Sequence, residues 1–513
     1  MRDAAPPERK PMRDAAPPER KPMRDAAPPE RKTALSASAD RPGVILFVLA
    51  ASGMVYALLQ GLVVPVLPLF GTVFRISGAE AAWILTAYLL SAAVTTAIGG
   101  RLGDRFGKRR VLAAVLAVAG AGTALSGSAP VTAVGVMIAG RVLQGAAAAA
   151  FPLAFAIIRE QLPAARTSGG NAVVSAIYGI GGGLGIILAG PITQHLSWRW
   201  LFWIPLLLAA VCLAGVLALL PESPARSREQ ISWTAGVLLS AGLVALLVSI
   251  SQGHAWGWGS ARVAGLLAGA AVLCAAWVIA EVRAAGPLVD VRMMRMRGVW
   301  TTNAAAVLLG FGVFGLFVLI PAMTELPRIG GFGFGASITG AGLYLLPAVA
   351  AMPAFAIAAG AAHRLAGSKL PMAAGSLLSM AGFAFLAASH TSSWQIYLGS
   401  GITGAGIGLS FAAMANLIVS AVRPEQTGVA TGMNILARTV GGSLGGQVAA
   451  SVLASNTGPH GLLAEQGFTV SFMIGAIGLA ASFLTSLAIP GKATPRSSQG
   501  QPSEHSYPGR ATA

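Results

Sequence analysis

The residues best placed to do chemistry lie in one short segment, Gly99–Arg110, between two long apolar runs. The segment holds four glycines and five cations but a single acid, Asp104. A lone carboxylate in such surroundings can cap a neighbouring helix or pair with Arg105 or Arg141, and a contact of this kind breaks and re-forms when packed helices move. We interpret the segment as a conformational latch. The alternative is a fixed topological anchor, which needs only the cations.

Two arginines lie inside apolar runs, where a cation is costly unless it faces a cavity or a partner. Arg438, with Asn434 one turn before it, is too far from either end of its run to reach water. We expect Arg438 to face a central cavity and either to bind an anionic or polar group of a substrate or to repel a proton. The alternative is a structural bond to helix carbonyls, to Asn416 or to Gln447. Arg141 is the second candidate, and its alternative role is a bond to carbonyls or lipid phosphate.

Composition indicates which elements must carry these residues. Of 513 residues, 55% are hydrophobic and 10% are charged, and the mean hydropathy of +0.71 excludes a soluble globular protein. The net charge of +17 is better explained by loops and tails that face anionic lipid, so we expect a lipid bilayer and no nucleic acid as partner. Cys212 and Cys274 lie within apolar runs and imply neither a disulfide framework nor a metal site.

Fourteen apolar runs are long enough to span a bilayer, since about 30 Å of hydrocarbon takes about 20 helical residues. The alternation of a membrane barrel is not visible, which leaves an all-α membrane protein. The predicted spans are 44–69, 79–99, 111–128, 131–158, 168–193, 198–220, 231–251, 261–281, 299–323, 336–361, 370–389, 393–420, 428–453 and 467–489.

Cations in the connecting loops set the orientation. Sixteen arginines and lysines lie in the loops of one side, whereas the opposite loops hold only Arg75, Arg199, Arg262 and Arg328. Because cytoplasmic loops carry the excess of cations, we expect a multi-pass protein of the inner (plasma) membrane with both termini in the cytoplasm. Residues 1–42, which begin with three copies of MRDAAPPERK spaced 11 residues apart, and residues 491–513 are predicted to be disordered cytoplasmic tails.

An internal repeat predicts two matched helix bundles. A shift of 260 residues places Gly100–Arg109 on Gly360–Lys369 without a gap, and Gly181–Gly185 on Gly441–Gly445. Two parallel bundles related by an axis along the membrane normal would give this repeat. The expected domains are a six-helix bundle at 43–220, two linker helices with their cytoplasmic loops at 221–298, and a second six-helix bundle at 299–490.

The segment around Asp104 resembles the loop between the second and third helices of major facilitator superfamily transporters, whose pattern is G-x-L-[AG]-D-R-x-G-[RK]-[RK]. With fourteen helices, the chain is similar to the drug:proton antiporter branch of that superfamily. The resemblance implies the major facilitator fold. The pattern matches at Leu102 and at the residues of the implied latch, which are Gly100, Gly103, Asp104, Arg105, Gly107, Lys108 and Arg109.

Two further motifs of the superfamily are similar. Its R-x-x-Q-G pattern fits Arg141, Gln144 and Gly145, and this resemblance implies that the arginine relays protons or organises the substrate path. The antiporter motif, a glycine-rich fifth helix that ends in Gly-Pro, is matched in part. It implies a helix-packing hinge at Gly181, Gly182, Gly183, Gly190 and Pro191.

Proton coupling lacks its usual residue. Related exporters often carry the proton on an acid in the first helix, and Leu59 stands at that position here. A leucine does not titrate, so a proton carrier would lie elsewhere. The acids near helix ends are Glu80, Glu160, Glu281 and Glu325. We interpret Glu80 and Glu325 as solvated end residues.

We therefore predict a secondary transporter, not an enzyme, that exports lipophilic drugs or an endogenous metabolite by alternating access. Its expected partners are a small-molecule substrate and protons, its energy source is the proton gradient without a cofactor, and we expect a monomer. An alternative is a facilitator or importer of a specific polar metabolite. A membrane receptor or enzyme is a remote alternative, because no catalytic cluster or nucleotide loop supports it.

Overall fold

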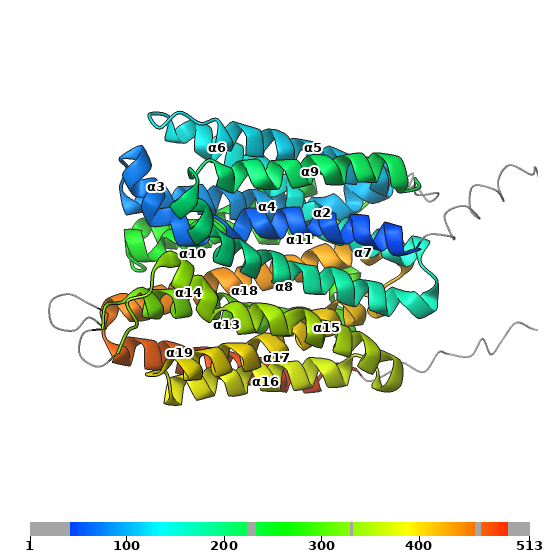
Figure 1. The fold of residues 1–513 in the computed structure, drawn as a ribbon. Coiled ribbons are helices and arrows are strands. Elements are labelled where there is room, and N and C mark those ends of the chain that lie inside the picture. The colour runs from blue at the N-terminus through cyan, green and yellow to red at the C-terminus, as the bar shows by residue number, and fades with distance from the viewer. Residues whose placement is uncertain (1–41, 223–231, 285, 329–331, 457–462, 491–513) are drawn as a thin grey trace, which may run out of the picture. The chain divides into compact units, whose positions relative to one another are not determined.

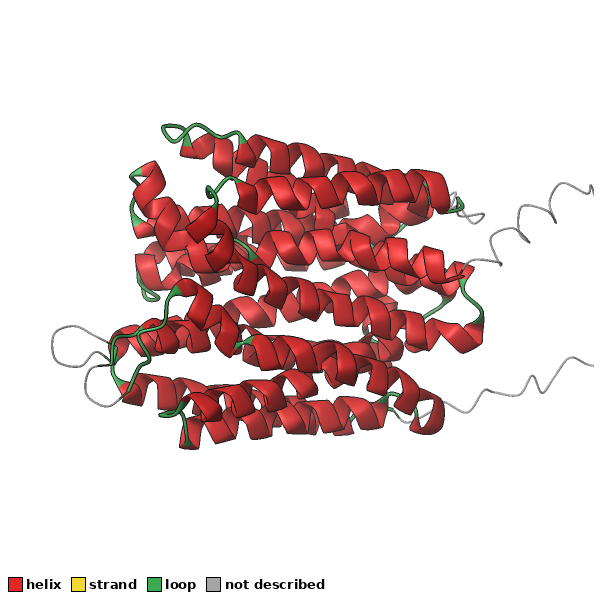
Figure 2. Cartoon of the chain, in the orientation of Figure 1, coloured by secondary structure: helices red, strands yellow, loops and turns green. Residues whose placement is uncertain are grey.

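The computed structural model describes residues 42–222, 232–284, 286–328, 332–456 and 463–490. All of the long elements in these ranges are helices, as Figure 2 shows. The all-α class predicted from the apolar runs is confirmed. The predicted tails lie outside the described residues, apart from Pro42 at the start of the first helix.

The N-terminal half contains six membrane-length units (Figure 1). Pro65 and Pro68 lack the N–H donor that a continuous helix needs, and the first unit is accordingly broken near them. Gly107, at φ 100°, turns the second unit into the third. The elements are α2 (Pro42–Gly61), η1 (Val64–Val66), α3 (Leu67–Phe74), α4 (Gly78–Phe106), α5 (Lys108–Gly127), α6 (Val134–Gln144), η2 (Gly145–Ala149), α7 (Ala150–Gln161), α8 (Ala164–His195) and α9 (Trp200–Leu219).

The linker holds α10 (Trp233–Trp256), α11 (Ala261–Arg283) and the short α12 (Val291–Met294). Ser232 and Ser260 cap α10 and α11, because each side-chain oxygen accepts a hydrogen bond from an N–H of the first turn. Leucines of α10 pack with α4 and α18 in one apolar cluster, and α11 packs on α10. The linker pair thus lies beside a contact between the two halves.

The C-terminal half repeats the plan of the first. Its elements are α13 (Arg297–Glu325), α14 (Ile338–Tyr344), α15 (Leu346–Ala366), α16 (Lys369–Ala388), α17 (Ser393–Ala421), η3 (Pro424–Gln426), α18 (Thr427–Ser455) and α19 (Glu465–Leu487). The bounds of α4 and of α14 with α15 are related by the predicted shift of 260 residues. The halves meet along two equivalent seams, α4 against α18 and α8 against α15.

Thirteen of the fourteen membrane-length units in the described ranges are apolar enough to cross a bilayer. The fourteenth, α18, carries Asn434, Arg438, Gln447 and several glycines, which lower its hydropathy. Because α18 packs between α4, α10, α13 and α19, most of these groups are shielded from lipid by protein. Fourteen helices, as predicted, therefore build the fold.

The two ends of the helices differ in charge. The turns from α4 to α5, from α7 to α8 and from α15 to α16 lie at one end and contain or adjoin Lys108, Arg159, Arg364 and Lys369. We call this the cationic end. The turns from α3 to α4, from α5 to α6 and from α8 to α9 lie at the opposite end. This arrangement follows from helices that cross the bundle in alternating directions (Figure 1).

Candidate functional site

A cavity of about 340 Å³ lies between the two halves. The N-terminal half lines it with α2, α3, α4 and α8, and the C-terminal half with α13, α15, α17 and α18. Its wall is mostly aliphatic and aromatic, and every residue that lines it is uncharged. Because Leu67, Leu85 and Gln447 lie nearer the opposite end of their helices, the cavity is displaced away from the cationic end. We call it the large cavity.

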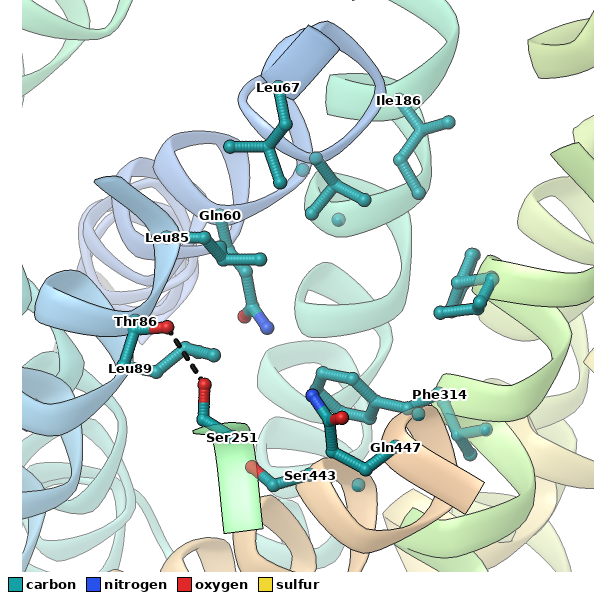
Figure 3. A pocket seen from close by; sticks show the side chains of 18 of the residues that line it. Gln60, Leu67, Leu85, Thr86, Leu89, Ile186, Ser251, Phe314, Ser443 and Gln447 are labelled. Atoms are coloured by element: carbon teal, nitrogen blue, oxygen red, sulfur yellow. Dashed lines mark hydrogen bonds between the residues drawn. The ribbon is translucent and has the colours of Figure 1, made fainter. Parts of the chain in front are cut away.

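Five polar side chains line the large cavity (Figure 3). The amides of Gln60 and Gln447 point into the open space from opposite halves. Thr86 Oγ1 and Ser251 Oγ lie 3.0 Å apart and share a hydrogen bond, and Ser443 also lines the cavity. Ser251 belongs to α10, so the linker helix contributes to the wall as well as joining the two halves.

Arg141 lies behind this wall and is fully buried. Its Nε donates to the Ile84 carbonyl at 3.0 Å, and its Nη1 donates to the Leu59 carbonyl at 3.0 Å and to Gln144 Oε1 at 2.6 Å. The guanidinium also lies 4.2 Å from the ring centre of Tyr88. The structure therefore shows the carbonyl-binding role that the sequence left as an alternative. One arginine joins α2, α4 and α6 directly behind the residues that line the cavity.

Gln144 and Gly145 complete this arrangement. Gln144 Nε2 donates to the Gly122 carbonyl at 3.2 Å and to Ser126 Oγ at 3.0 Å, which fixes the amide oxygen that Arg141 contacts. A side chain at Gly145 would approach Ser91 of α4 too closely, so the glycine permits α4 to pack against η2. The R-x-x-Q-G residues are thus brought together as a buried polar network. A role in proton relay stays a prediction.

Arg438, which was expected to face a central cavity, does not line the large cavity. Arg438 and Asn434 line a second, smaller cavity of about 20 Å³, nearer the cationic end. The Arg438 guanidinium lies 4.1 Å from the ring centre of Phe411, which lines both cavities. Asn434 Nδ2 donates to Asn303 Oδ1 of α13 at 2.9 Å. The ring of Phe411 therefore separates Arg438 from the large cavity.

The latch residues gather at the cationic end, but the predicted partners of Asp104 are wrong. Lys108 Nζ lies 3.2 Å from Asp104 Oδ1 and 2.5 Å from Glu160 Oε1, and the lysine is only 3% exposed. Asp104 therefore pairs with Lys108, and not with Arg105 or Arg141. Arg141 is about five helical turns away along α4, beside Ile84. The cluster joins α4, α5 and α7 within the N-terminal half.

The other latch residues fix the backbone around this cluster. Arg109 donates to the carbonyls of Val216 and Leu217, which ties α5 to the end of α9. Arg105 stacks on the neighbouring Phe106, with 5.4 Å from its guanidinium carbon to the ring centre. An added side chain at Gly103 would collide with Leu153, and one at Gly107 would collide with Glu222.

Contacts between the halves close the cationic end. Arg159 of α7 donates to the Val419 carbonyl and to Thr427 Oγ1, both at 2.7 Å, and to the Val422 carbonyl at 3.0 Å. Asn171 Nδ2 of α8 donates to Asn416 Oδ1 of α17 at 3.0 Å, and Asn416 Nδ2 donates to Ser168 Oγ at 3.3 Å. These bonds join elements of the N-terminal half to elements of the C-terminal half.

Gly100 is the latch residue at this junction. A side chain there would collide with the backbone of Gly428 in α18, so the two helices pack backbone against backbone. At the opposite end the halves touch where Thr339 Oγ1 of α14 donates to Gln194 Oε1 of α8 at 3.1 Å.

The glycines of α8 serve close packing. Side chains at Gly181, Gly183 and Gly190 would collide with Ala57 of α2, with Val349 of α15 and with Thr339 of α14, respectively. Gly182 lines the large cavity, where an added Cβ meets open space. Pro191 lies inside α8, which continues to His195. A flexing role for this helix stays a prediction.

The acids of the described ranges all lie at helix ends or in turns. Glu80 is exposed and accepts hydrogen bonds from the N–H and hydroxyl of Ser77, as expected for a helix-end residue. Glu281 is buried and accepts from Trp277 Nε1 and from the N–H groups of Leu288 and Val289. The others are Asp104, Glu160, Glu222, Asp290, Glu325, Glu425 and Glu465.

Sequence reasoning missed several residues of the site. Asn171 carried a usable signal, since an amide inside a spanning helix marks a polar contact by default. Arg159 was counted only as a loop cation, and Ser251 only as part of a linker helix. Phe411 carried no signal, because an aromatic residue in an apolar helix looks the same whether it packs or separates two cavities.

Comparison with known proteins agrees with the fold. The family model of the Major Facilitator Superfamily matches residues 49–446. The tetracenomycin C resistance and export protein of Streptomyces glaucescens is 31% identical over 440 residues, which cover 83% of this chain and 78% of that protein. An uncharacterised MFS-type transporter of Mycobacterium tuberculosis is 30% identical over 416 residues, which cover 80% of this chain and 59% of that protein.

A solved structure shares the same architecture. The proton:xylose symporter of the major facilitator superfamily, bound to a bromodeoxyglucose, superimposes with a TM-score of 0.61. The superposition covers 88% of this chain and 97% of the symporter at 16% identity, a likeness of fold alone. The helix plan, the repeat and the family match agree, and the chain belongs to the major facilitator superfamily of multi-pass membrane transporters.

Proposed function

We propose that the chain exports lipophilic, drug-like compounds or an endogenous metabolite across the inner membrane by alternating access. The cationic end then faces the cytoplasm, as the excess of cations in its loops favours, and both termini are cytoplasmic. The supporting relatives include a protein named for resistance to and export of tetracenomycin C. The chemistry of the large cavity supports the same conclusion.

The observation that carries the proposal is a cavity between two halves that is closed on one side. Arg159, Asn171 and Asn416 bind across the halves at the cationic end, whereas the large cavity lies toward the other end. This geometry fits a transporter whose cationic end is closed. Rocking of the halves would break these bonds and open the same cavity toward the cytoplasm.

The lining favours export of lipophilic solutes over uptake of a polar metabolite. Aliphatic and aromatic side chains such as Val64, Phe314 and Phe317 make up most of the wall, and five neutral polar groups are spread over it. A sugar-like solute would lose its hydration without enough partners to replace it, whereas a lipophilic one gains from burial.

We further propose the proton gradient as the energy source. Because the residues that line the large cavity are uncharged, the carrier would act from outside it. Asp104, which is 6% exposed, is the best-placed candidate. It pairs with Lys108, and Lys108 also pairs with Glu160, the residue that follows Arg159. Replacing Asp104 by Asn should then reduce proton-driven export more strongly than export down a substrate gradient.

A cavity-filling variant tests the proposal. Gly182 lines the large cavity and Gly265 lies on the exposed face of α11, and an added Cβ meets open space at both. Energised cells that carry Gly265→Trp should extrude a lipophilic dye like wild type, and Gly182→Trp should extrude at least about tenfold less because the indole occupies the substrate volume. A protonophore should abolish the wild-type signal. Unchanged extrusion by Gly182→Trp would refute the assignment of the cavity.

A further inference from the structure

Charged side chains are distributed unevenly between the middle and the ends of the helices. Arg141 and Arg438 lie inside membrane-length units, at the level of the two cavities, whereas the acids of the described ranges lie at helix ends or in turns. Arg141 donates hydrogen bonds to two carbonyls and an amide, which are neutral acceptors. Its positive charge is spread but not cancelled by these bonds. Among the residues that the structure describes, the charged side chains at this depth are therefore these two cations.

Arg438 is the cation nearest the large cavity on the C-terminal side. Its guanidinium lies 4.1 Å from the centre of the Phe411 ring, and that ring also lines the large cavity. A solute stacked on the other side of the ring would have its charge about 9–11 Å from the guanidinium, since the centres of stacked rings lie about 4.5–7 Å apart. An aromatic ring does not screen a charge at that distance as water would.

The polar groups of the wall suit an acceptor on the solute. The amides of Gln60 and Gln447 and the hydroxyl of Ser443 can all donate hydrogen bonds, and Figure 3 shows the two amides directed into the open space. A phenolate or carboxylate oxygen could accept from them. A cation would find amide and hydroxyl oxygens and the faces of aromatic rings, but no carboxylate to balance its charge among the lining residues.

From this arrangement we infer that the large cavity selects anionic and neutral lipophilic solutes over cationic ones, with Arg438 behind Phe411 as the specificity-determining residue. The inference rests on the proposed function and narrows its substrate class. Opposite unit charges about 10 Å from a guanidinium differ more than a hundredfold in affinity at an effective dielectric constant of about 20. Water in the cavity reduces this difference, and we expect at least about a tenfold preference.

Two dyes of one shape and opposite charge provide the test. The methyl ester of fluorescein and the corresponding rhodamine methyl ester with unsubstituted amino groups share a xanthene and a benzoate ester. At mildly alkaline pH the first is a phenolate anion and the second a cation. Binding of each dye to the full chain in nanodiscs is measured by fluorescence anisotropy, with empty nanodiscs of the same lipid subtracted. Wild type should bind the anion at least about tenfold more tightly.

Three variants assign the preference to its cause. Arg438→Gln should bring the two affinities within about threefold of each other, and Arg438→Lys, which keeps the charge, should retain the preference. Gln447→Glu keeps the shape of the side chain but adds a carboxylate to the wall, and it should shift the preference toward the cation. This third variant tests the electrostatics even where replacement of Arg438 prevents folding.

The outcomes separate this inference from the proposed function. Equal binding, or tighter binding of the cation, by wild type overturns the inference and leaves export in place, because a dye that binds is still a candidate substrate. An unchanged preference in both Arg438→Gln and Gln447→Glu overturns the assignment of its cause. Failure of both dyes to bind contradicts the cavity assignment itself, and the charge preference then falls with it.

Discussion

Asn171 of α8 donates a hydrogen bond of 3.0 Å to Asn416 of α17, and this bond joins the two halves of the protein near the cationic end. Both side chains are buried, with 1% and 4% of their surface exposed. A neutral amide pair can open and close without leaving a buried charge, unlike an ion pair. The closure of this end therefore depends on neutral groups and on Arg159, while the Asp104 cluster stabilises one side of it.

Removing the amide pair should loosen the closed end. In Asn171→Ala, the loss of a buried hydrogen bond worth about 1 kcal/mol should raise the population open to the cationic end roughly fivefold. Ser175 lines the cavity of about 20 Å³ beside Arg438. Replaced by Cys in a chain without Cys212 and Cys274, it provides a reporter of access. Labelling by an impermeant maleimide in inside-out vesicles should speed up by this factor.

The control for this prediction is Asn456→Ala at the opposite end. Asn456 donates to the Val452 carbonyl of its own helix and joins no two halves. Labelling of the reporter should stay at the wild-type rate in this variant. An equal acceleration in both variants would show that general destabilisation, and not the cross-half bond, controls access.

The contact between Gly100 and Gly428 gives a steric prediction. A methyl group at Gly100 collides with the backbone of Gly428, and such overpacking typically costs about 1–3 kcal/mol. Gly100→Ala should thus open the cationic end about tenfold by the same labelling rate. Gly169→Ala is the matched control, since an added Cβ at Gly169 in α8 meets nothing within 4 Å. If the reporter is labelled at the same rate in Gly100→Ala and in Gly169→Ala, the contact between Gly100 and Gly428 does not control closure of the cationic end.

Lys108 should matter more for stability than either acid beside it. Lys108→Met leaves the buried carboxylate of Asp104 without the lysine ammonium and removes a partner of the more exposed Glu160, and breaking a buried pair such as that of Asp104 costs about 3–5 kcal/mol. Asp104→Asn keeps the pair between Lys108 and Glu160 and should cost less. The melting temperature of the detergent-purified protein should fall in the order wild type, Asp104→Asn, Lys108→Met. Equal losses in the two variants would contradict the shared role of the lysine.

Arg141 should act through position, not through charge alone. Lysine keeps the charge but presents one ammonium group, which does not span the Ile84 and Leu59 carbonyls as the guanidinium does. Because these carbonyls precede Leu85 and Gln60 of the cavity wall, Arg141→Lys should raise the KM for export at least about fivefold. Arg199→Lys, where the arginine donates to the Ala129 carbonyl away from the cavity, should change it little. An unaltered KM in Arg141→Lys would contradict this prediction, because it would show that Arg141 contributes its charge and not the position of its guanidinium.

The sequence predicts the fold well because its signals are local. Runs of about 20 apolar residues mark the helices, and the 260-residue shift marks the two halves, down to the matching bounds of α4 and of α14 with α15. The site is predicted less well, because it depends on how each helix is rotated. Arg438 was expected in the large cavity, and the rotation of α18 places it behind Phe411 instead. In the same way, no local pattern shows that α10 would lie against α4 and bring Ser251 to the wall.

A reversible cross-link between the halves tests the central claim most directly. Asn171→Cys and Asn416→Cys, introduced together in a chain without Cys212 and Cys274, place two thiols where the amides now meet. Joining them with a short, reducible cross-linker should hold the cationic end closed and stop dye export, and reduction should restore it. Either single cysteine treated in the same way should export normally. Export that continues at the wild-type rate while the cross-link is intact would contradict alternating access between the two halves.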